Sequence, residues 1–108
     1  MAYVEGRTIH DADSHIMELP GEIDAYFDPK YRKAFSERSV RPGVDLSWVE
    51  KARGLQGDPA FRAGHEENLL LRKNHQAHGA FLKADRPRTL DLLGFASQLV
   101  FTTAALGN

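Results

Sequence analysis

The sequence predicts an α/β fold in which two strands are separated by a mainly helical insertion. Residues 7–13 have the character of a short strand, and residues 97–103 form a β-rich apolar run without alternation, which is typical of a strand buried on both faces. Residues 86–93 have the apolar side of a helix and lead directly into that second strand. A helix followed at once by a buried strand is typical of α/β proteins.

The first strand, residues 7–13, is low in apolar residues and ends in carboxylates. If the strand continues, alternate side chains point to one face, so Asp13 and His15 project together while Ser14 points away. Zinc, manganese and iron accept a carboxylate oxygen and an imidazole nitrogen as ligands. The spacing therefore predicts two metal ligands, and the alternative is a solvated strand end in which Asp13 caps the next turn.

Short helices are expected at the start of the insertion, which covers residues 20–80. Pro20 suits the first turn of a helix over residues 22–27, because its fixed φ is already helical. A second helix is expected over residues 30–37. A third is expected to end at Gly54, since glycine is a common helix terminator.

The second half of the insertion combines a loop with a longer helix. Residues 56–64 contain two glycines and a proline, which predicts a loop. Residues 65–78 carry a leucine run flanked by charges, which suits a helix ended by Gly79. His75 and His78 would share one face of that helix, where a solvated helix end is favoured over a metal-chelating pair because no carboxylate or third ligand accompanies them.

The last segment has the most regular pattern. Asp85 is expected to cap the helix over residues 86–93, with Pro87 in its first turn and Gly94 as its terminator. The strand at residues 97–103 follows after a short connection. No internal repeat interrupts this order.

Composition limits the classes of function. A chain of 108 residues with 42% apolar and 27% charged residues is one ordinary globular domain. Its net charge of −1 gives no electrostatic reason to bind nucleic acid or an anionic membrane. No apolar run approaches the roughly 20 residues of a membrane helix, so we expect a cytoplasmic protein. Without cysteine, any metal must use oxygen and imidazole ligands.

Two separated segments resemble one family. Residues 11–18, Asp-Ala-Asp-Ser-His-Ile-Met-Glu, are similar to the first barrel strand of the amidohydrolase-related metal-dependent hydrolases. That branch also contains aminocarboxymuconate-semialdehyde decarboxylase and resorcylate-type decarboxylases. Residues 85–103 resemble the family's first long helix and second strand, in the same order and with a helical insertion between the two segments.

The resemblance implies a metal site at the end of the first strand. Most of the family has a His-x-His pair there, and Asp13 stands at the first position while His15 stands at the second. Both would be ligands of a divalent metal, zinc first and manganese or iron as alternatives. Glu18 would lie near the approaching substrate, or be a solvated loop carboxylate, and Asp11 would have a structural role nearby.

The family fold is a TIM (β/α)₈ barrel of about 250 residues or more, with the active site at the ends of several strands. The resemblance therefore implies that residues 1–108 form an N-terminal barrel fragment. Its two parallel strands would be residues 7–13 and 97–103, with the insertion at 20–80 and the helix at 86–93. The further ligands and the general base and acid would come from later strands, so no catalytic residue is assigned here.

Two parallel strands alone expose both edges of their sheet. Residues 99–106 are uncharged and apolar or β-branched over most of their length, so this segment is expected to self-associate or to pair with a complementary chain.

The resemblance implies the N-terminal part of a metal-dependent hydrolase or decarboxylase, a lyase, that acts on a small organic substrate and is inactive alone. The alternative is a noncatalytic barrel fragment that forms oligomers or binds a partner, and it predicts no metal-dependent turnover.

Overall fold

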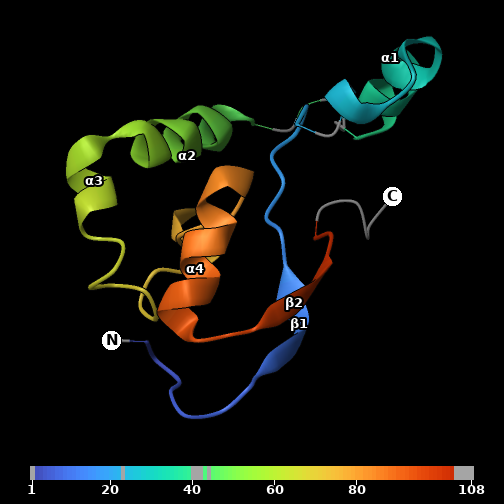
Figure 1. Cartoon of the computed structure of the whole chain (residues 1–108). Helices are drawn as coiled ribbons and strands as arrows, with labels where there is room; N and C mark the ends of the chain where they lie inside the picture. Colours follow the sequence, from blue (N-terminus) through green and yellow to red (C-terminus); the bar gives the residue numbers. More distant parts are fainter. Residues whose placement is uncertain (1, 23, 40–42, 44, 104–108) are drawn as a thin grey trace.

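The computed structural model describes residues 2–22, 24–39, 43 and 45–103 (Figure 1). It is a small α/β chain whose two strands, β1 (His10–His15) and β2 (Ser97–Phe101), pair in parallel. The helical elements between them are, in order, η1 (Asp24–Tyr26), α1 (Pro29–Ser39), α2 (Ser47–Gly57), α3 (Pro59–Ala63), η2 (Asn74–Gln76), η3 (Lys83–Asp85) and α4 (Arg86–Leu93). The predicted α/β class is confirmed.

The ladder between β1 and β2 has one irregularity, a register shift between Asp11 and Ser14. The carboxylate of Asp11 holds it in place. Its Oδ1 accepts the backbone N–H of Asp13 at 3.0 Å, and its Oδ2 accepts a hydrogen bond from Gln98 Nε2 at 3.3 Å. A bulge of this kind bends a strand and re-aims the side chains that follow it. Asp11 thus has the structural role expected for it.

Helix α4 begins and ends at the residues that the sequence predicts. Pro87 lies in its first turn, and Gly94 adopts a left-handed φ of 77° after its last residue. The Gly94 N–H donates to the carbonyls of the preceding turn, which closes the helix. The expected cap is wrong, because the Asp85 side chain makes no capping hydrogen bond and pairs with Arg62 instead.

The early insertion follows the prediction in outline. The helix expected over residues 22–27 is a single 3₁₀ turn, η1, and residue 23 lies outside the described residues. Helix α1 covers the range expected for the second helix. Helix α2 continues past Gly54 to Gly57, since one interior glycine costs a helix only about 1 kcal/mol.

Two expectations for the later insertion are wrong. The predicted loop at residues 56–64 contains helix α3, because Asp58 caps it by accepting the Ala60 N–H and a proline occupies the first helical position. The helix predicted over residues 65–78 is absent; residues 64–71 form successive turns, followed by the short η2.

Two side chains of this segment bond backbone carbonyls that precede it. Asn68 Nδ2 donates to the Gly64 carbonyl at 2.8 Å, and Arg72 Nη1 donates to the Phe61 carbonyl at 2.6 Å. Farther on, Asn74 has a φ of +52°, which no helix interior accommodates. The chain is therefore compact locally without being helical.

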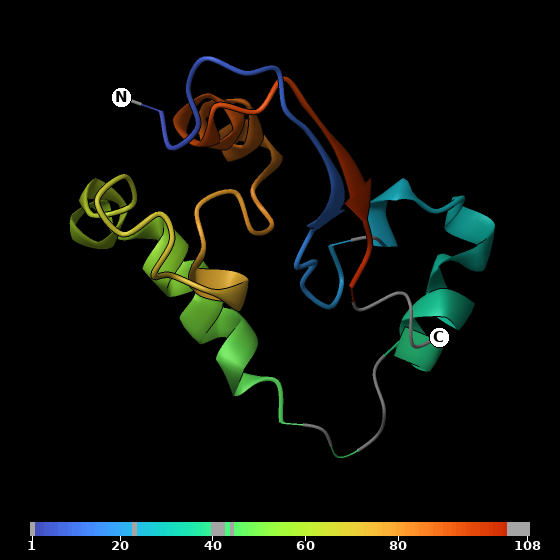
Figure 2. The same cartoon turned by 90° about the horizontal axis from the view of Figure 1, so that it is seen from below.

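The hydrophobic core is small. Leu19, Val49, Ala52, Ala80 and Phe81 form it, and only Leu19 is almost fully buried, at 1% exposure. The radius of gyration is 15.7 Å, against about 13 Å for a compact domain of this length. Figures 1 and 2 both show why, since α1 stands apart from α2, α3 and α4.

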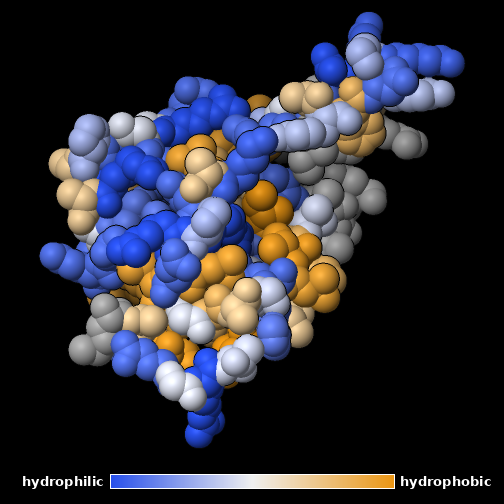
Figure 3. All heavy atoms as spheres, in the orientation of Figure 1, coloured by the Kyte–Doolittle hydropathy of each residue, from blue (hydrophilic) through white to orange (hydrophobic). Residues whose placement is uncertain are grey.

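Strand β2 is not buried on both faces as expected. Leu99 is 58% exposed, Val100 46% and Phe101 41%. Figure 3 shows hydrophobic residues gathered over the sheet on this face of the molecule. Among the described residues no element covers these side chains, and residues 104–106, the rest of the segment expected to associate, lie outside that range.

No helix in the described part of the chain combines the length and the apolar character that crossing a membrane requires.

Candidate metal centre

Asp13 and His15 leave β1 together near its carboxyl end, as strand periodicity predicts. His15 Nε2 lies 3.4 Å from Asp13 Oδ1. Both side chains are open to solvent, with exposed fractions of 40% for His15 and 89% for Asp13. Ser14 between them faces the other way and is buried. The carboxyl ends of parallel strands are the usual position for ligand sites in α/β proteins.

The environment of His15 fixes which ring nitrogen carries hydrogen. Its Nδ1 lies 3.2 Å from the Thr102 carbonyl oxygen and 3.2 Å from Thr103 Oγ1. A carbonyl can only accept, so Nδ1–H is the donor and neutral His15 keeps its lone pair on Nε2. That lone pair faces the Asp13 carboxylate. Two acceptors 3.4 Å apart repel each other unless a cation, either a proton or a metal ion, lies between them.

The same distance suits zinc. With zinc bonded to nitrogen and oxygen at about 2.1 Å, tetrahedral ligands lie about 3.4 Å apart. His15 also has the second hydrogen bond that metal-binding histidines generally make through the other ring nitrogen. In the residues that the structure describes, no group of three histidine or carboxylate side chains could hold a metal. The described part of the chain thus supplies two metal ligands of suitable geometry, and it supplies no third ligand beside them.

Glu18 lies in a more enclosed position than a solvated loop carboxylate would. It is 6% exposed, and its two carboxylate oxygens lie 3.0 and 3.1 Å from the backbone nitrogen of Thr103, whose N–H they accept. Glu18 therefore anchors the chain beyond β2, which carries the partners of His15 Nδ1. The expected alternative of a solvated loop carboxylate is wrong, because Glu18 is buried, and its place near a substrate stays a prediction.

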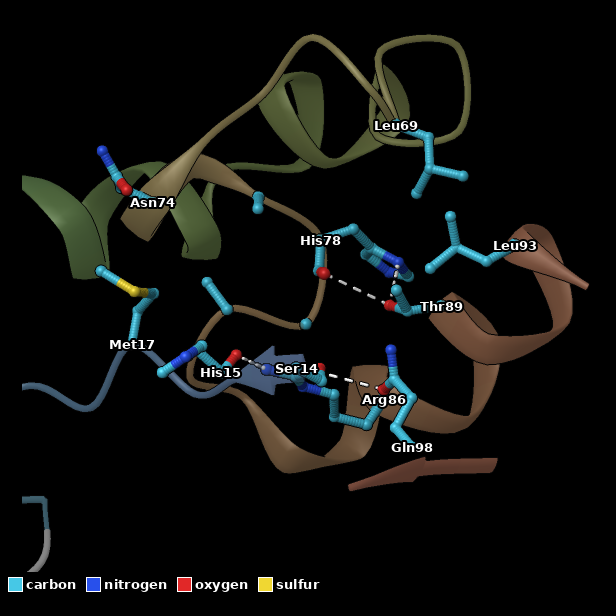
Figure 4. A pocket seen from close by; sticks show the side chains of 13 residues that line it. Ser14, His15, Met17, Leu69, Asn74, His78, Arg86, Thr89, Leu93 and Gln98 are labelled. Carbon is cyan, nitrogen blue, oxygen red and sulfur yellow. Dashed lines mark hydrogen bonds between the residues drawn. The ribbon is translucent and has the colours of Figure 1, made fainter. Parts of the chain in front are cut away.

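Sequence reasoning missed Arg86 on the opposite side of the sheet. Its guanidinium donates from Nη1 to Ser14 Oγ at 3.1 Å and to Gln98 Oε1 at 3.4 Å, and from Nη2 to the His15 carbonyl. These groups line a pocket of about 280 Å³ between the sheet and α4 (Figure 4). The available signal was the pair of polar residues, Ser14 and Gln98, at strand positions that face a helix.

His75 and His78 do not share a helix face. The His75 ring lies 4.7 Å from the Trp48 ring, measured between centroids, and burial lowers its pKa. The His78 ring lies 4.8 Å from that of His65 and its Nδ1 is 2.8 Å from Thr89 Oγ1. Burial lowers the pKa of His78 as well. Both expectations for the pair, a solvated helix end and chelation, fail because the helix is absent.

His65 is 3% exposed, and both of its ring nitrogens have partners. Arg72 Nη1 lies 3.1 Å from Nδ1 and can only donate, so Nδ1 accepts and Nε2–H donates to Gln56 Oε1 at 2.9 Å. Gln56 Nε2 in turn donates to the carbonyls of His75 and Ala77. Burial lowers the pKa of His65, and the neighbouring charges of His78 and Arg72 lower it further.

An ion pair borders this cluster. Arg62 donates to both carboxylate oxygens of Asp85, at 2.8 and 3.1 Å, and this holds the pKa of Asp85 below its usual range. Both ring nitrogens of His65 thus have protein partners. We therefore regard His65 as structural, in contrast to His15.

Similarity to known proteins adds nothing to this geometry. No family model, no curated protein and no solved structure matches this chain.

Proposed function

We propose that this chain is the N-terminal part of a metal-dependent hydrolase or decarboxylase of the amidohydrolase-related type, acting on a small organic substrate. Asp13 and His15 would be two ligands of the metal, zinc first and manganese or iron as alternatives. One observation carries the proposal. His15 Nδ1 bonds the Thr102 carbonyl, and its Nε2 faces the Asp13 carboxylate at 3.4 Å, at the carboxyl end of a parallel strand.

A divalent metal at this position would lower the pKa of a bound water towards about 7, or polarise a substrate oxygen during loss of carbon dioxide. The chain's own contribution is to orient the pair. Thr102 and Thr103 fix the His15 ring through Nδ1, while Asp11 stabilises the bulge that contains Asp13. Further ligands would come from later strands of a barrel.

The exposed apolar side chains of β2 support the view that more protein covers this sheet. Leu99, Val100 and Phe101 are all more than 40% exposed. Burying the half of each side chain that is still exposed would contribute about 1 kcal/mol. Later strands of a barrel, or a complementary chain, would account for them.

The second candidate is a noncatalytic barrel fragment that forms oligomers through the same β2 surface. The exposure of Leu99, Val100 and Phe101 favours it equally. It differs in predicting no function for the Asp13 and His15 pair. Metal content is therefore the property that separates the two candidates.

The test compares Asp13→Ala and His15→Ala with the unaltered chain by gel filtration in zinc-containing buffer, followed by elemental analysis of each peak. We expect the isolated chain to bind zinc weakly, because two ligands scarcely offset dehydration of the ion, and both variants to lose that binding. His10→Ala is the matched control, since His10 lies at the other end of the same strand, where its Nδ1 is 2.8 Å from Ser97 Oγ. Equal zinc content in all four proteins would reject the metal centre and leave the oligomeric fragment.

A further inference from the structure

Arg86 is the first residue of α4, and its guanidinium reaches both strands of the sheet. It donates to the His15 carbonyl and to Ser14 Oγ on β1, and to Gln98 Oε1 on β2. Figure 4 shows Arg86 beside Ser14 and Gln98, on the helix side of β1. The metal-competent side chains of β1 point to the other face.

The two terminal nitrogens of the guanidinium donate to the strands. Its Nε is buried and has no hydrogen-bond partner in the described part of the chain. Gly79 lies so close that a Cβ there would stand 3.4 Å from Arg86 Cδ and 3.6 Å from Nε. Arg86 also lines the pocket between the sheet and α4, and the hydrogen bonds that it makes are those to the strands.

Holding this cation carries an energetic cost. Burial lowers the pKa of Arg86, and the charge of Asp11 opposes that shift. Asp11 does not pair with it directly; the two are linked through Gln98, which donates to Asp11 and accepts from Arg86. Partial burial of a cation without a direct counter-ion is unfavourable, and the hydrogen bonds to Ser14, His15 and Gln98 offset part of that cost.

Arg86 bonds β1 at Ser14 and His15, next to the irregularity in the ladder. The bulge lies between Asp11 and Ser14, so Asp13 is within it and His15 follows it. The direction of these two side chains therefore depends on how Ser14 and the His15 backbone are held. Arg86 holds one atom of each of these two residues, and a lysine could not donate to both strands from the planar fork of a guanidinium.

We propose that Arg86 is a positioning residue for the Asp13 and His15 pair. Its hydrogen bonds to the Ser14 hydroxyl and the His15 carbonyl keep both side chains directed at one cation. This rests on the function proposed above. Arg86 touches neither metal nor substrate, and it acts through the backbone of β1.

The test is Arg86→Lys, with Arg88→Lys as the matched control. Arg88 lies on the same helix, but its side chain is 56% exposed and pairs with Glu66. Zinc is titrated into each protein and followed by NMR. We expect Arg86→Lys to weaken zinc binding by about tenfold or more, the range seen for residues that orient ligands, and Arg88→Lys to stay within about twofold. Ser14→Ala removes the hydroxyl that accepts from Arg86 and changes no charge, so it should weaken zinc binding by an intermediate factor.

A second readout does not involve metal. At pH 8 the ¹⁵N shifts of the His15 ring should report one species protonated at Nδ1 in the unaltered chain and in Arg88→Lys. Arg86→Lys should give a mixture of tautomers, because the Thr102 carbonyl no longer lies in register with the ring. If Arg86→Lys shows an unchanged ring spectrum, the proposal is overturned, whatever zinc does. If the unaltered chain fails to bind zinc, the metal function is rejected and the ring spectrum alone decides the positioning role. Circular dichroism establishes that each variant is folded.

Discussion

Two regions of this molecule use histidine in opposite ways. His65 is 3% exposed, and its two ring nitrogens are bonded to Gln56 and Arg72. His15 has one nitrogen bonded to the chain beyond β2, and the other faces the Asp13 carboxylate in the open. A histidine whose two nitrogens both have protein partners has no capacity left for a ligand. One with a fixed tautomer and a lone pair aimed at a carboxylate has the capacity that metal binding requires.

The contrast predicts that altering the buried cluster changes stability, whereas altering the open pair changes metal binding.

Gln56→Leu should be the most destabilising. It leaves the His65 N–H and the carbonyls of His75 and Ala77 without their partner in a buried setting. At about 1 kcal/mol or more for each such group, the free energy of unfolding should fall by about 3 kcal/mol, measured by urea denaturation. Gln76→Leu is the control, because Gln76 is exposed, and it should change stability by less than about 0.5 kcal/mol. Similar losses in both variants would show that the cluster does not stabilise the fold.

Asp85→Asn should lower the free energy of unfolding by about 2 kcal/mol, because it leaves Arg62 without the carboxylate that accepts from two of its nitrogens. The comparison is Arg88→Ala, which removes the 2.6 Å ion pair with Glu66, a shorter contact whose two side chains are each 56% exposed. That exposed pair should contribute no more than about 0.5 kcal/mol. If the two losses were equal, burial would not be the factor that distinguishes these pairs.

Stability should fall as the pH is lowered through the histidine range. Burial lowers the pKa of His65, His75 and His78 from the usual 6.5, so the unfolded chain binds protons first. Their contribution is complete above about pH 6.5 and is lost below it, whereas the lowered pKa of Asp85 affects stability only below its usual 3.8. Urea denaturation at pH 8, 7, 6 and 5 measures this slope. In the double variant His65→Gln with His78→Asn, stability should depend less steeply on pH. A steeper dependence would show that these histidines do not lower stability when the pH falls.

Asp13→Ala should leave the fold almost unchanged. Its side chain is 89% exposed, so the free energy of unfolding should shift by less than about 0.5 kcal/mol while zinc binding is lost. Measuring both stability and zinc binding of this variant shows whether Asp13 contributes to the metal site or to the fold. A large loss of stability would mean that Asp13 is a structural residue like Asp85.

The parts of the fold predicted from sequence are those with a local physical cause. Pro87 in the first turn and Gly94 beyond the last turn determine α4, and strand periodicity determines that Asp13 and His15 share a face. The helix predicted over residues 65–78 is absent, and Asn74 within that segment has a φ of +52° that a helix does not accommodate. The side chains of Asn68 and Arg72 bond carbonyls that precede the segment. A periodic pattern of leucines does not encode these features.

The site was predicted only in part for the same reason. The pair on β1 follows from spacing alone. Arg86 lies 71 residues after His15, and Thr103 lies 85 residues after Glu18, so neither contact has a local signal. Polar residues at inward strand positions, Ser14 above all, indicate that a buried partner exists without identifying it.

The most direct test of the central claim follows the His15 ring nitrogens by NMR while zinc is added to the unaltered chain and to Asp13→Ala. The tautomer set by the Thr102 carbonyl predicts a protonated Nδ1 throughout and a zinc-dependent shift at Nε2 that disappears in the variant. A ring that carries its hydrogen on Nε2 alone, or an Nε2 signal that saturating zinc leaves unmoved, would contradict the account.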